Sequence, residues 1–239
     1  MKSNGYFIKD CELSDVNSSL IGNKAFNLGY LYSKSDGKVN IPKFAVLRSP
    51  NHDLNKSIVN YVGGIEQYLR YPIIVRSSSN VEDSINSFAG LFDSYVCNNR
   101  HELIENVLLV VEGRNSLKIQ KYCERVGISP DSIDVSVLLQ EYKSAELSGV
   151  LFTKHPITGD DSIFYIEYAF KTSDSVTSGS DKPEVLIISK DRLCELEYPF
   201  LQLSNMARFI EQNFNYPVDI EWVVSDGLVW IVQTRRITS

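Results

Sequence analysis

The stretch Tyr216–Ser239 reads YPVDIEWVVSDGLVWIVQTRRITS and carries the clearest local pattern in the chain. Two apolar runs rich in valine and isoleucine, Ile220–Val224 and Leu228–Val232, flank the short segment Ser225-Asp226-Gly227. An Asp-Gly pair between two such runs is a strong short-range signal for a β-hairpin. The sequence therefore predicts a hairpin over this stretch.

Four polar side chains interrupt this apolar hairpin. Asp219 and Glu221 are two residues apart, so they face the same side of a strand, and Gln233 and Arg235 do the same on the returning strand. We expect the hairpin to bring two carboxylates, an amide and a guanidinium to one face. Carboxylate and amide oxygens suit Mg²⁺, and a planar cation suits a phosphate. A surface hairpin with cross-strand ion pairs is the alternative explanation of the same residues.

The composition is that of an ordinary globular chain, with 43% hydrophobic and 23% charged residues in a length of 239. This length suits one large domain or two small lobes. The net charge of −6 argues against a general binder of nucleic acids or anionic membranes. There is no apolar run of membrane-spanning length and no secretory signal pattern, and the four cysteines lack metal-binding spacing. We therefore expect free thiols in a cytoplasmic protein.

Periodicity elsewhere in the chain predicts the fold class. Helical spacing of apolar residues covers 54–69, 102–111 and 200–214, and strand-like runs cover 44–47, 135–142, 149–153, 163–168 and 185–188. Strands and helices are mixed along the chain, without the strict strand–helix–strand alternation of parallel sheets. This arrangement favours the α+β class with antiparallel sheets.

Two further segments carry residues that suit a phosphate. Lys24 lies at the predicted start of a helix, where the helix dipole disfavours a cation but favours a bound anion. The predicted strand Tyr71–Arg76 delivers Arg76 to a loop rich in serine and glycine, where backbone amides and a guanidinium can approach an anion. A solvated lysine and a hydroxyl-rich surface loop are the alternative explanations.

Five short motifs occur in a fixed order along nearly the whole chain. They read GNKAFNL at Gly22–Leu28, VRSS at Val75–Ser78, SFAG at Ser87–Gly90, SGVLFTKHPITGD at Ser148–Asp160, and DIEW with QTRRIT at Asp219–Trp222 and Gln233–Thr238. In this order the chain resembles the nucleotide-binding domain of phosphoenolpyruvate synthase, pyruvate phosphate dikinase and rifampin phosphotransferase. The resemblance implies an α+β ATP-grasp fold in which two lobes with mainly antiparallel sheets clasp the nucleotide. A single domain would cover 1–239, with lobes of about 1–135 and 136–239.

The resemblance also implies ATP and Mg²⁺ as cofactors and a role for each matching residue. Lys24 and Arg76 would grip the ATP phosphates, with Ser87, Gly90 and Ser94 around them, while Gln140, Glu141 and Tyr142 would face adenine. Glu221 and Gln233, assisted by Asp219, would hold Mg²⁺, and Arg235 would bind the transferring phosphate. Lys24, Arg76 and Arg235 are thus the expected catalytic residues, because phosphoryl transfer needs mainly positioning and charge neutralisation.

Three features depart from the family pattern. The GLGE segment is replaced by Lys171-Thr172-Ser173-Asp174, and the DP pair becomes His155-Pro156. We interpret His155 as a turn residue that caps Thr158, with a phosphate-accepting or acid–base role as the alternative. The chain also stops where the ATP-grasp domain stops, so we expect the swivelling domain with its phosphorylatable histidine to be absent.

The sequence therefore predicts an ATP- and Mg²⁺-dependent phosphotransferase of kinase or dikinase type. Its acceptor would be a small molecule or a histidine of a separate partner protein, and the sequence does not choose between them. Neither a nucleic acid nor a membrane is an expected partner. The alternatives are an ATP-grasp ligase that works through an acyl phosphate and a nucleotide-binding module without turnover.

Overall fold

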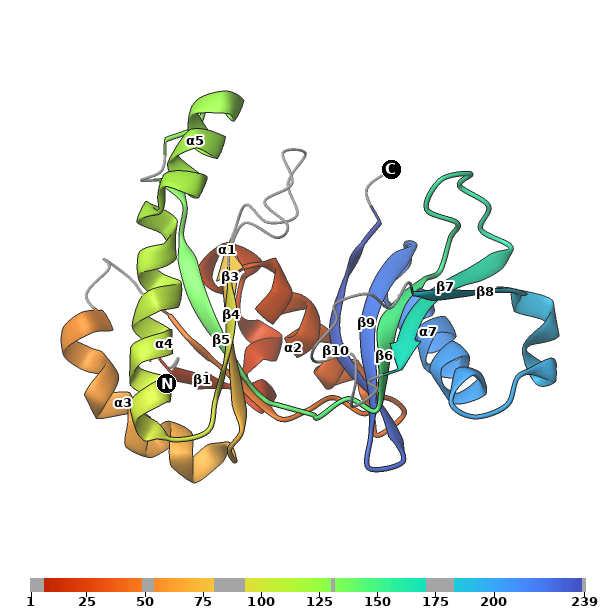
Figure 1. The fold of residues 1–239 in the computed structure, drawn as a ribbon, viewed down its shortest axis with the longest axis horizontal. Coiled ribbons are helices and arrows are strands. Elements are labelled where there is room, and N and C mark those ends of the chain that lie inside the picture. The colour runs from red at the N-terminus through yellow and green to blue at the C-terminus, as the bar shows by residue number, and fades with distance from the viewer. Residues whose placement is uncertain (1–6, 49–53, 80–92, 130–131, 171–182, 238–239) are drawn as a thin grey trace. The chain divides into compact units, whose positions relative to one another are not determined.

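The computed structural model of the chain describes residues 7–48, 54–79, 93–129, 132–170 and 183–237 (Figure 1). Its strands form two five-stranded sheets, ordered β1-β2-β5-β3-β4 and β10-β9-β6-β7-β8. Every strand pair in both sheets is antiparallel. Helices accompany each sheet, so the predicted α+β class with antiparallel sheets is confirmed.

The chain divides into two units, each of which holds one sheet. Unit 1 comprises Met1–Tyr30 and Lys43–Tyr142, and unit 2 comprises Leu31–Pro42 and Lys143–Ser239. The middle strand of the first sheet, β5 (Val135–Glu141), therefore belongs wholly to unit 1. Each unit is described below by itself.

Unit 1 is built from the first sheet and the helices around it. The other strands are β1 (Phe7–Lys9), β2 (Phe44–Leu47), β3 (Ile73–Ser79) and β4 (Ser94–Cys97). The helical elements are η1 (Asp10–Asp15), α1 (Ser18–Ile21), α2 (Asn23–Ser35), α3 (Leu54–Tyr68), α4 (Arg100–Glu112), η3 (Gly113–Asn115) and α5 (Leu117–Val126). The boundary between the units falls within α2.

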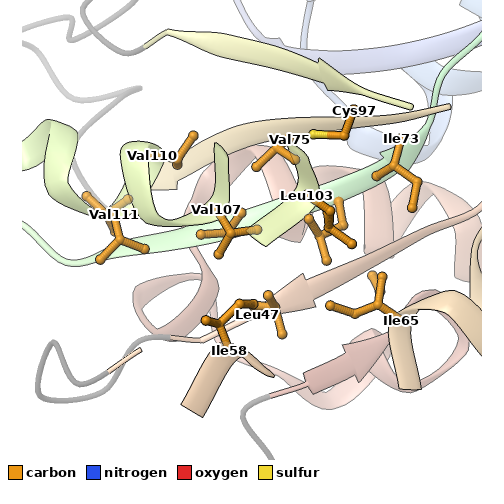
Figure 2. Close-up of a cluster of buried hydrophobic side chains, with 14 of the residues drawn as sticks. Leu47, Ile58, Ile65, Ile73, Val75, Cys97, Leu103, Val107, Val110 and Val111 are labelled. Atoms are coloured by element: carbon orange, nitrogen blue, oxygen red, sulfur yellow. The ribbon is translucent and has the colours of Figure 1, made fainter. Parts of the chain in front are cut away.

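The main core of unit 1 lies between one face of this sheet and α3, α4 and α5. Figure 2 shows Ile73 and Val75 of β3 beside Leu103 and Val107 of α4. All four side chains are fully buried. Because side chains alternate along a strand, Ile74 and Arg76 of β3 face the other side of the sheet.

Local signals account for the limits of the helices beside this core. The side chain of Asn99 accepts a hydrogen bond from the backbone of Glu102 at 3.1 Å and so caps α4. The Ser116 hydroxyl does the same for the Ile119 amide of α5, at 3.4 Å. Gly127, with φ of 73°, ends α5 in the left-handed conformation that glycine adopts without steric cost.

Unit 2 is built around the second sheet and one long helix. Its elements are β6 (Leu147–Phe152), β7 (Ile163–Phe170), β8 (Glu184–Ser189), η5 (Lys190–Glu195), α7 (Phe200–Phe214), β9 (Val218–Ser225) and β10 (Leu228–Arg236). The helix α7 packs on one face of the sheet, where the rings of Phe200 and Trp222 lie 6.2 Å apart (Figure 1). Ile220 is fully buried and Trp222 almost so. Asp219 and Glu221, which alternate with them, therefore face away from α7.

The structure also shows the state of the cysteines and the character of the helices. All four cysteines are free thiols, with Cys97 and Cys123 buried and Cys11 and Cys194 exposed. In the described parts of the chain, no helix combines the length and the apolar character that a membrane crossing requires.

A buried carboxylate, Asp10, joins three elements of unit 1. It accepts hydrogen bonds from the Tyr68 hydroxyl at 2.5 Å, the Cys11 amide at 2.7 Å and the Phe44 amide at 3.3 Å. Burial and this carboxylate together raise the pKa of the Tyr68 hydroxyl. Asp10 is thus the acceptor that satisfies polar groups at the joint of η1, α3 and β2.

We expect Asp10→Ala to lower the free energy of unfolding by about 3 kcal/mol, because it leaves buried donors without an acceptor. Urea denaturation followed by circular dichroism measures this loss. Asp161→Ala, at an exposed carboxylate, is the matched control and should change stability by less than about 0.5 kcal/mol. Equal stability of the two variants would contradict the assignment of Asp10.

Candidate functional site

The hairpin predicted from the sequence is formed by β9 and β10. Its loop consists of Asp226 and Gly227, with φ of 52° and 67°. Positive φ at both loop residues is typical of the type I′ turn, whose twist matches that of the flanking strands. From the pair Leu228 and Ser225 the strands then run in regular register to the pair Ile231 and Trp222.

One extra residue, Val232, then interrupts the register of the hairpin. Ile231 pairs with Trp222, but the next pair is Gln233 with Glu221. This is a β-bulge, in which two residues of one strand oppose one residue of the other. Beyond it Gln233 lies opposite Glu221, and Arg235 lies opposite Asp219. Directly opposed residues share a face of the sheet, so all four predicted polar side chains face away from α7.

Asp219 and Arg235 form an ion pair on this face. The Nε of Arg235 donates to Oδ2 of Asp219 at 2.5 Å. Asp219 is buried and Arg235 is about one-third exposed, so the carboxylate holds one edge of a guanidinium that remains accessible. A charge-assisted contact of this kind restricts the orientation of the planar group. This arrangement suits an arginine that must meet a phosphate in a defined direction.

Glu221 and Gln233 form the second cross-strand pair. Gln233 is 2% exposed, and its Oε1 is buried without a hydrogen-bond donor among the described residues. A buried amide oxygen without a donor costs free energy unless a cation or another donor reaches it. With the partly exposed carboxylate of Glu221 opposite, this oxygen fits a cation ligand.

The donor set indicates how such a cation would be held. Among the described residues, no group of three or more His, Cys, Asp or Glu side chains could hold a metal ion. Mg²⁺ sites of nucleotide enzymes typically use one or two carboxylates and complete their shell with phosphate oxygens and water. The chemistry of Glu221 and Gln233 therefore fits Mg²⁺ in the presence of a phosphate ligand.

One further carboxylate on the same face, Glu167, was not among the site residues predicted from the sequence. The register runs from Glu221 through Val150 of β6 to Glu167 of β7, two strands away. At the usual strand spacing this places the backbones of Glu221 and Glu167 roughly 10 Å apart. Desolvation and the neighbouring Glu167 raise the pKa of the Tyr165 hydroxyl. Alternation along β7 was visible in the sequence, but the strand order that brings β7 beside β6 was not.

His155 has the structural role that the sequence analysis favoured. Its Nδ1 accepts hydrogen bonds from the backbone amides of Ile157 at 3.1 Å and Thr158 at 3.2 Å. Its ring also lies 5.0 Å from the ring of Tyr165. Because Nδ1 serves as acceptor, the neutral ring carries its proton on Nε2. The imidazole thus acts as a hydrogen-bond acceptor within this turn, at the position where the family motif has an aspartate.

In unit 1, Arg76 lies on the sheet face opposite the main core. It pairs with Ser94 of β4 and with Leu138 of β5, while its neighbour Val75 points into the core. Arg76 and Ser94 therefore share one face across neighbouring strands. Arg76 is partly buried and Ser94 is exposed.

Lys24 lies in the first turn of α2, and this turn is attached to the strand that carries Arg76. The backbone amide of Ala25 donates to Oγ of Ser78 at 3.0 Å, within the buried interior. Ser78 is two positions from Arg76 on β3 and on the same face. The structure thus brings Lys24, Arg76 and Ser94 to one side of the first sheet.

Gln140 lies on that same face, in register with Ile74 of β3. It is 1% exposed, and its Nε2 is buried without an acceptor among the described residues. The next two residues, Glu141 and Tyr142, donate their amides to Lys43 O at 2.9 Å and Pro72 O at 2.8 Å. Gln140 therefore presents a donor that suits a ring nitrogen of adenine, whereas the amides of Glu141 and Tyr142 already have acceptors.

Some predicted residues lie outside the described parts of the chain. These are Ser87 and Gly90 of the predicted phosphate loop and the segment Lys171–Asp174. The described set thus comprises Lys24, Arg76, Ser94, Gln140, Glu141 and Tyr142 in unit 1, and Asp219, Glu221, Gln233 and Arg235 in unit 2.

Curated proteins similar to this chain include phosphotransferases and phosphoenolpyruvate synthases. The rifampicin phosphotransferase of Bacillus cereus is 25% identical over 222 residues, which cover 78% of this chain and 25% of that protein. A probable phosphoenolpyruvate synthase of Methanothermobacter thermautotrophicus is 27% identical over 203 residues, which cover 70% of this chain and 30% of that protein. The chain thus spans less than a third of either relative.

A solved structure gives an independent view of the fold. The VanG D-Ala:D-Ser ligase of Enterococcus faecalis matches with a TM-score of 0.51 and 12% identity, over 92% of this chain and 53% of that one. At this identity the likeness shows the fold alone, and it confirms the predicted α+β ATP-grasp fold.

A family model matches most of the chain. The model describes the AMP/ATP-binding domain of pyruvate phosphate dikinase, and it matches residues 48–198 and 194–239. These matches include the strand of Arg76, the strand of Gln140 and the whole hairpin of Glu221 and Gln233. The chain belongs to the pyruvate phosphate dikinase AMP/ATP-binding domain family.

Proposed function

We propose that this chain binds ATP together with Mg²⁺ and transfers a phosphoryl group from it, as a kinase or a dikinase. One observation carries the proposal. Two nearly fully buried side-chain amides, Gln140 and Gln233, each have an atom without a hydrogen-bond partner among the described residues. Buried polar atoms are rarely left in this state in native proteins. The two are residues that the resemblance noted in the sequence would place beside adenine and at the metal ion.

The three cations expected from the sequence would serve the phosphates of the nucleotide. Lys24 and Arg76 would hold the phosphate chain, with Ser87, Gly90 and Ser94 beside it. Arg235, oriented by Asp219, would bind the phosphoryl group that is transferred. Such groups act by positioning and by neutralising charge that develops during transfer, and no covalent chemistry is required of them.

The metal ion would be held by Glu221 and Gln233, with Asp219 beside them. When bound, Mg²⁺ neutralises phosphate charge and fixes the geometry of the transferring group. Asp219 has a second duty in this scheme, because its Oδ2 accepts the hydrogen bond of Arg235. It would therefore couple the orientation of the guanidinium to the position of the metal ion.

The acceptor would be a small molecule or a histidine of a separate partner protein. The similar proteins are named for rifampicin and for phosphoenolpyruvate, and they are more than three times as long as the matched region. The proposal therefore stops at the transfer of a phosphoryl group from ATP.

Product analysis tests the proposal. The purified chain is incubated with ATP and Mg²⁺, alone and with pyruvate, rifampicin or a cell extract, and nucleotides are resolved by chromatography, with EDTA as the metal-removal control. AMP plus phosphate indicates a dikinase, and ADP with a phosphorylated acceptor indicates a kinase. ADP that appears only with an acid and an amine together would instead indicate a ligase. ATP binding without turnover in any mixture would indicate a non-catalytic module, and absence of ATP binding would overturn the proposal.

The orphan amide of Gln140 gives a prediction with two opposite effects. We expect Gln140→Leu to weaken adenosine binding about tenfold, because the nucleobase loses its donor. The same change should raise the free energy of unfolding by about 1 kcal/mol, because a buried donor without an acceptor is removed. Calorimetric binding and urea denaturation measure the two effects. Gln212→Leu, at an exposed glutamine of α7, should produce neither, and an unstable Gln140→Leu with normal adenosine binding would contradict the assignment.

A further inference from the structure

The junction between α1 and α2 lies directly against strand β3. Gly22, which ends α1, has φ of 76°, a conformation that side chains with a Cβ rarely adopt. A Cβ added to Gly22 would lie 2.3 Å from the carbonyl carbon of Ser78 and 2.5 Å from its Oγ. The backbone of the junction therefore approaches β3 as closely as glycine permits.

A buried hydrogen bond holds this contact together. Ala25 is the third residue of α2, where backbone amides have no acceptor within the helix. Its amide donates to Oγ of Ser78 at 3.0 Å, and the serine lies 53 residues further along the chain. Ser78 is fully buried. A hydroxyl from a distant strand thus does for α2 what the capping residue before a helix usually does.

This contact joins the two elements that carry the phosphate-binding cations of unit 1. Lys24 immediately precedes Ala25, and Arg76 lies two positions before Ser78 on the same face of β3. Along a strand this spacing corresponds to about 7 Å. A single hydrogen bond, from Ala25 to Ser78, therefore links the backbone beside Lys24 with the strand that carries Arg76.

We propose that Ser78 is a positioning residue that sets the place of Lys24 relative to Arg76, so that both cations engage the same phosphate chain. The inference rests on the proposed binding of ATP. Ser78 acts only through the start of α2 and makes no contact with the nucleotide itself. Its loss should therefore affect the recognition of phosphates and leave the recognition of adenosine unchanged.

The neighbouring strand supplies a matched control. Ser136 pairs with Ser78 across β3 and β5, and its Oγ donates to the backbone carbonyl of Leu20 at 3.2 Å. Ser136 is also buried, but it holds α1, which carries none of the predicted phosphate ligands. Ser78→Ala and Ser136→Ala thus each remove one buried hydroxyl. The first hydroxyl contacts α2 and the second contacts α1.

The first measurement compares the affinities of the two variants for ATP and for adenosine by calorimetry. We expect Ser78→Ala to weaken ATP binding about tenfold and adenosine binding less than about twofold. Ser136→Ala should change both by less than about twofold. Ser78→Cys, which keeps a weak acceptor, should give an intermediate loss and covers the case in which the alanine variant does not fold. Equal losses for ATP and adenosine would show a structural effect alone and overturn the inference.

The second measurement asks whether Ser78 acts through Lys24. In a Lys24→Ala background, Ser78→Ala should weaken ATP binding by less than about a further twofold, because the group that it positions is already absent. A full tenfold effect in that background would overturn the inference. If the unmodified chain fails to bind ATP, the proposed function itself fails. If it binds ATP and only Lys24→Ala weakens binding, the role of Ser78 alone is wrong.

Discussion

Glu221→Ala is expected to abolish Mg²⁺-dependent nucleotide turnover, by about 10³-fold or more, while the fold stays intact. Glu221 pairs directly with Gln233 and supplies the carboxylate opposite its orphan oxygen, so its loss removes the charged half of the proposed metal pair. Its side chain faces away from α7 and is partly exposed, which is why truncation leaves the core unchanged.

Steady-state assays over a range of Mg²⁺ concentrations measure the effect of Glu221→Ala. Urea denaturation and circular dichroism report whether the fold is retained. Glu195→Ala removes an exposed carboxylate that pairs with Arg192 in the same unit, and it should leave turnover unchanged. Turnover of Glu221→Ala at the level of the unmodified chain would remove Glu221 from the metal assignment.

Arg235→Ala is expected to lower turnover by about 10²- to 10³-fold and to weaken adenosine binding by less than about twofold. The contact of a guanidinium with phosphate oxygens strengthens as negative charge develops during transfer, whereas adenosine has no phosphate. Arg235→Lys should recover only part of the rate, because an ammonium group lacks the planar fork and the Nε donor that Asp219 now orients.

The adjacent residue supplies the control for Arg235. Arg236 is exposed on the opposite face of β10, where its guanidinium lies 5.0 Å from the centre of the Tyr216 ring. Arg236→Ala should therefore keep normal kinetics. Arg235→Ala also removes one partner of the buried Asp219 carboxylate, so the stability of each variant is measured in parallel. Unchanged kinetics in a folded Arg235→Ala would exclude this arginine from the site.

Much of the secondary structure was predictable because it depends on local patterns. The helix predicted over 200–214 has the observed bounds of α7, and the strand predicted over 44–47 has those of β2. In both segments the apolar pattern begins and ends at the same residues as the element. No distant contact is therefore needed to define the bounds. The predicted ATP-grasp fold followed from the order of the motifs and is confirmed by the structural comparison.

Features that depend on distant contacts were not predictable. Ser78 was visible as part of VRSS, but its hydrogen bond to Ala25 requires β3 to meet the start of α2. Glu167 shares a face with Glu221 only because β6 lies between β7 and β9. The sequence around Ser78 or Glu167 carries no signal of these contacts, because the order of strands is decided by the packing of whole elements.

The hairpin shows where the two kinds of information meet. The sequence by itself determined the strands, the Asp226-Gly227 turn and the identity of the polar residues. The prediction that Gln233 and Arg235 share a face with Asp219 and Glu221 proved correct, but the local pattern alone did not require it. A two-residue loop sets Leu228 opposite Ser225, and regular pairing from there would place Gln233 opposite Ile220, on the face that packs against α7.

Only the tertiary structure decided that Gln233 and Arg235 face the same side as Asp219 and Glu221. The period of a strand is two residues, so the single extra residue Val232 moves every later side chain of β10 to the other face. Without this bulge an amide and a guanidinium would be buried against the apolar surface of α7, which is energetically unfavourable. The buried face of the second sheet, and not the hairpin sequence, therefore selects the register that assembles the candidate site.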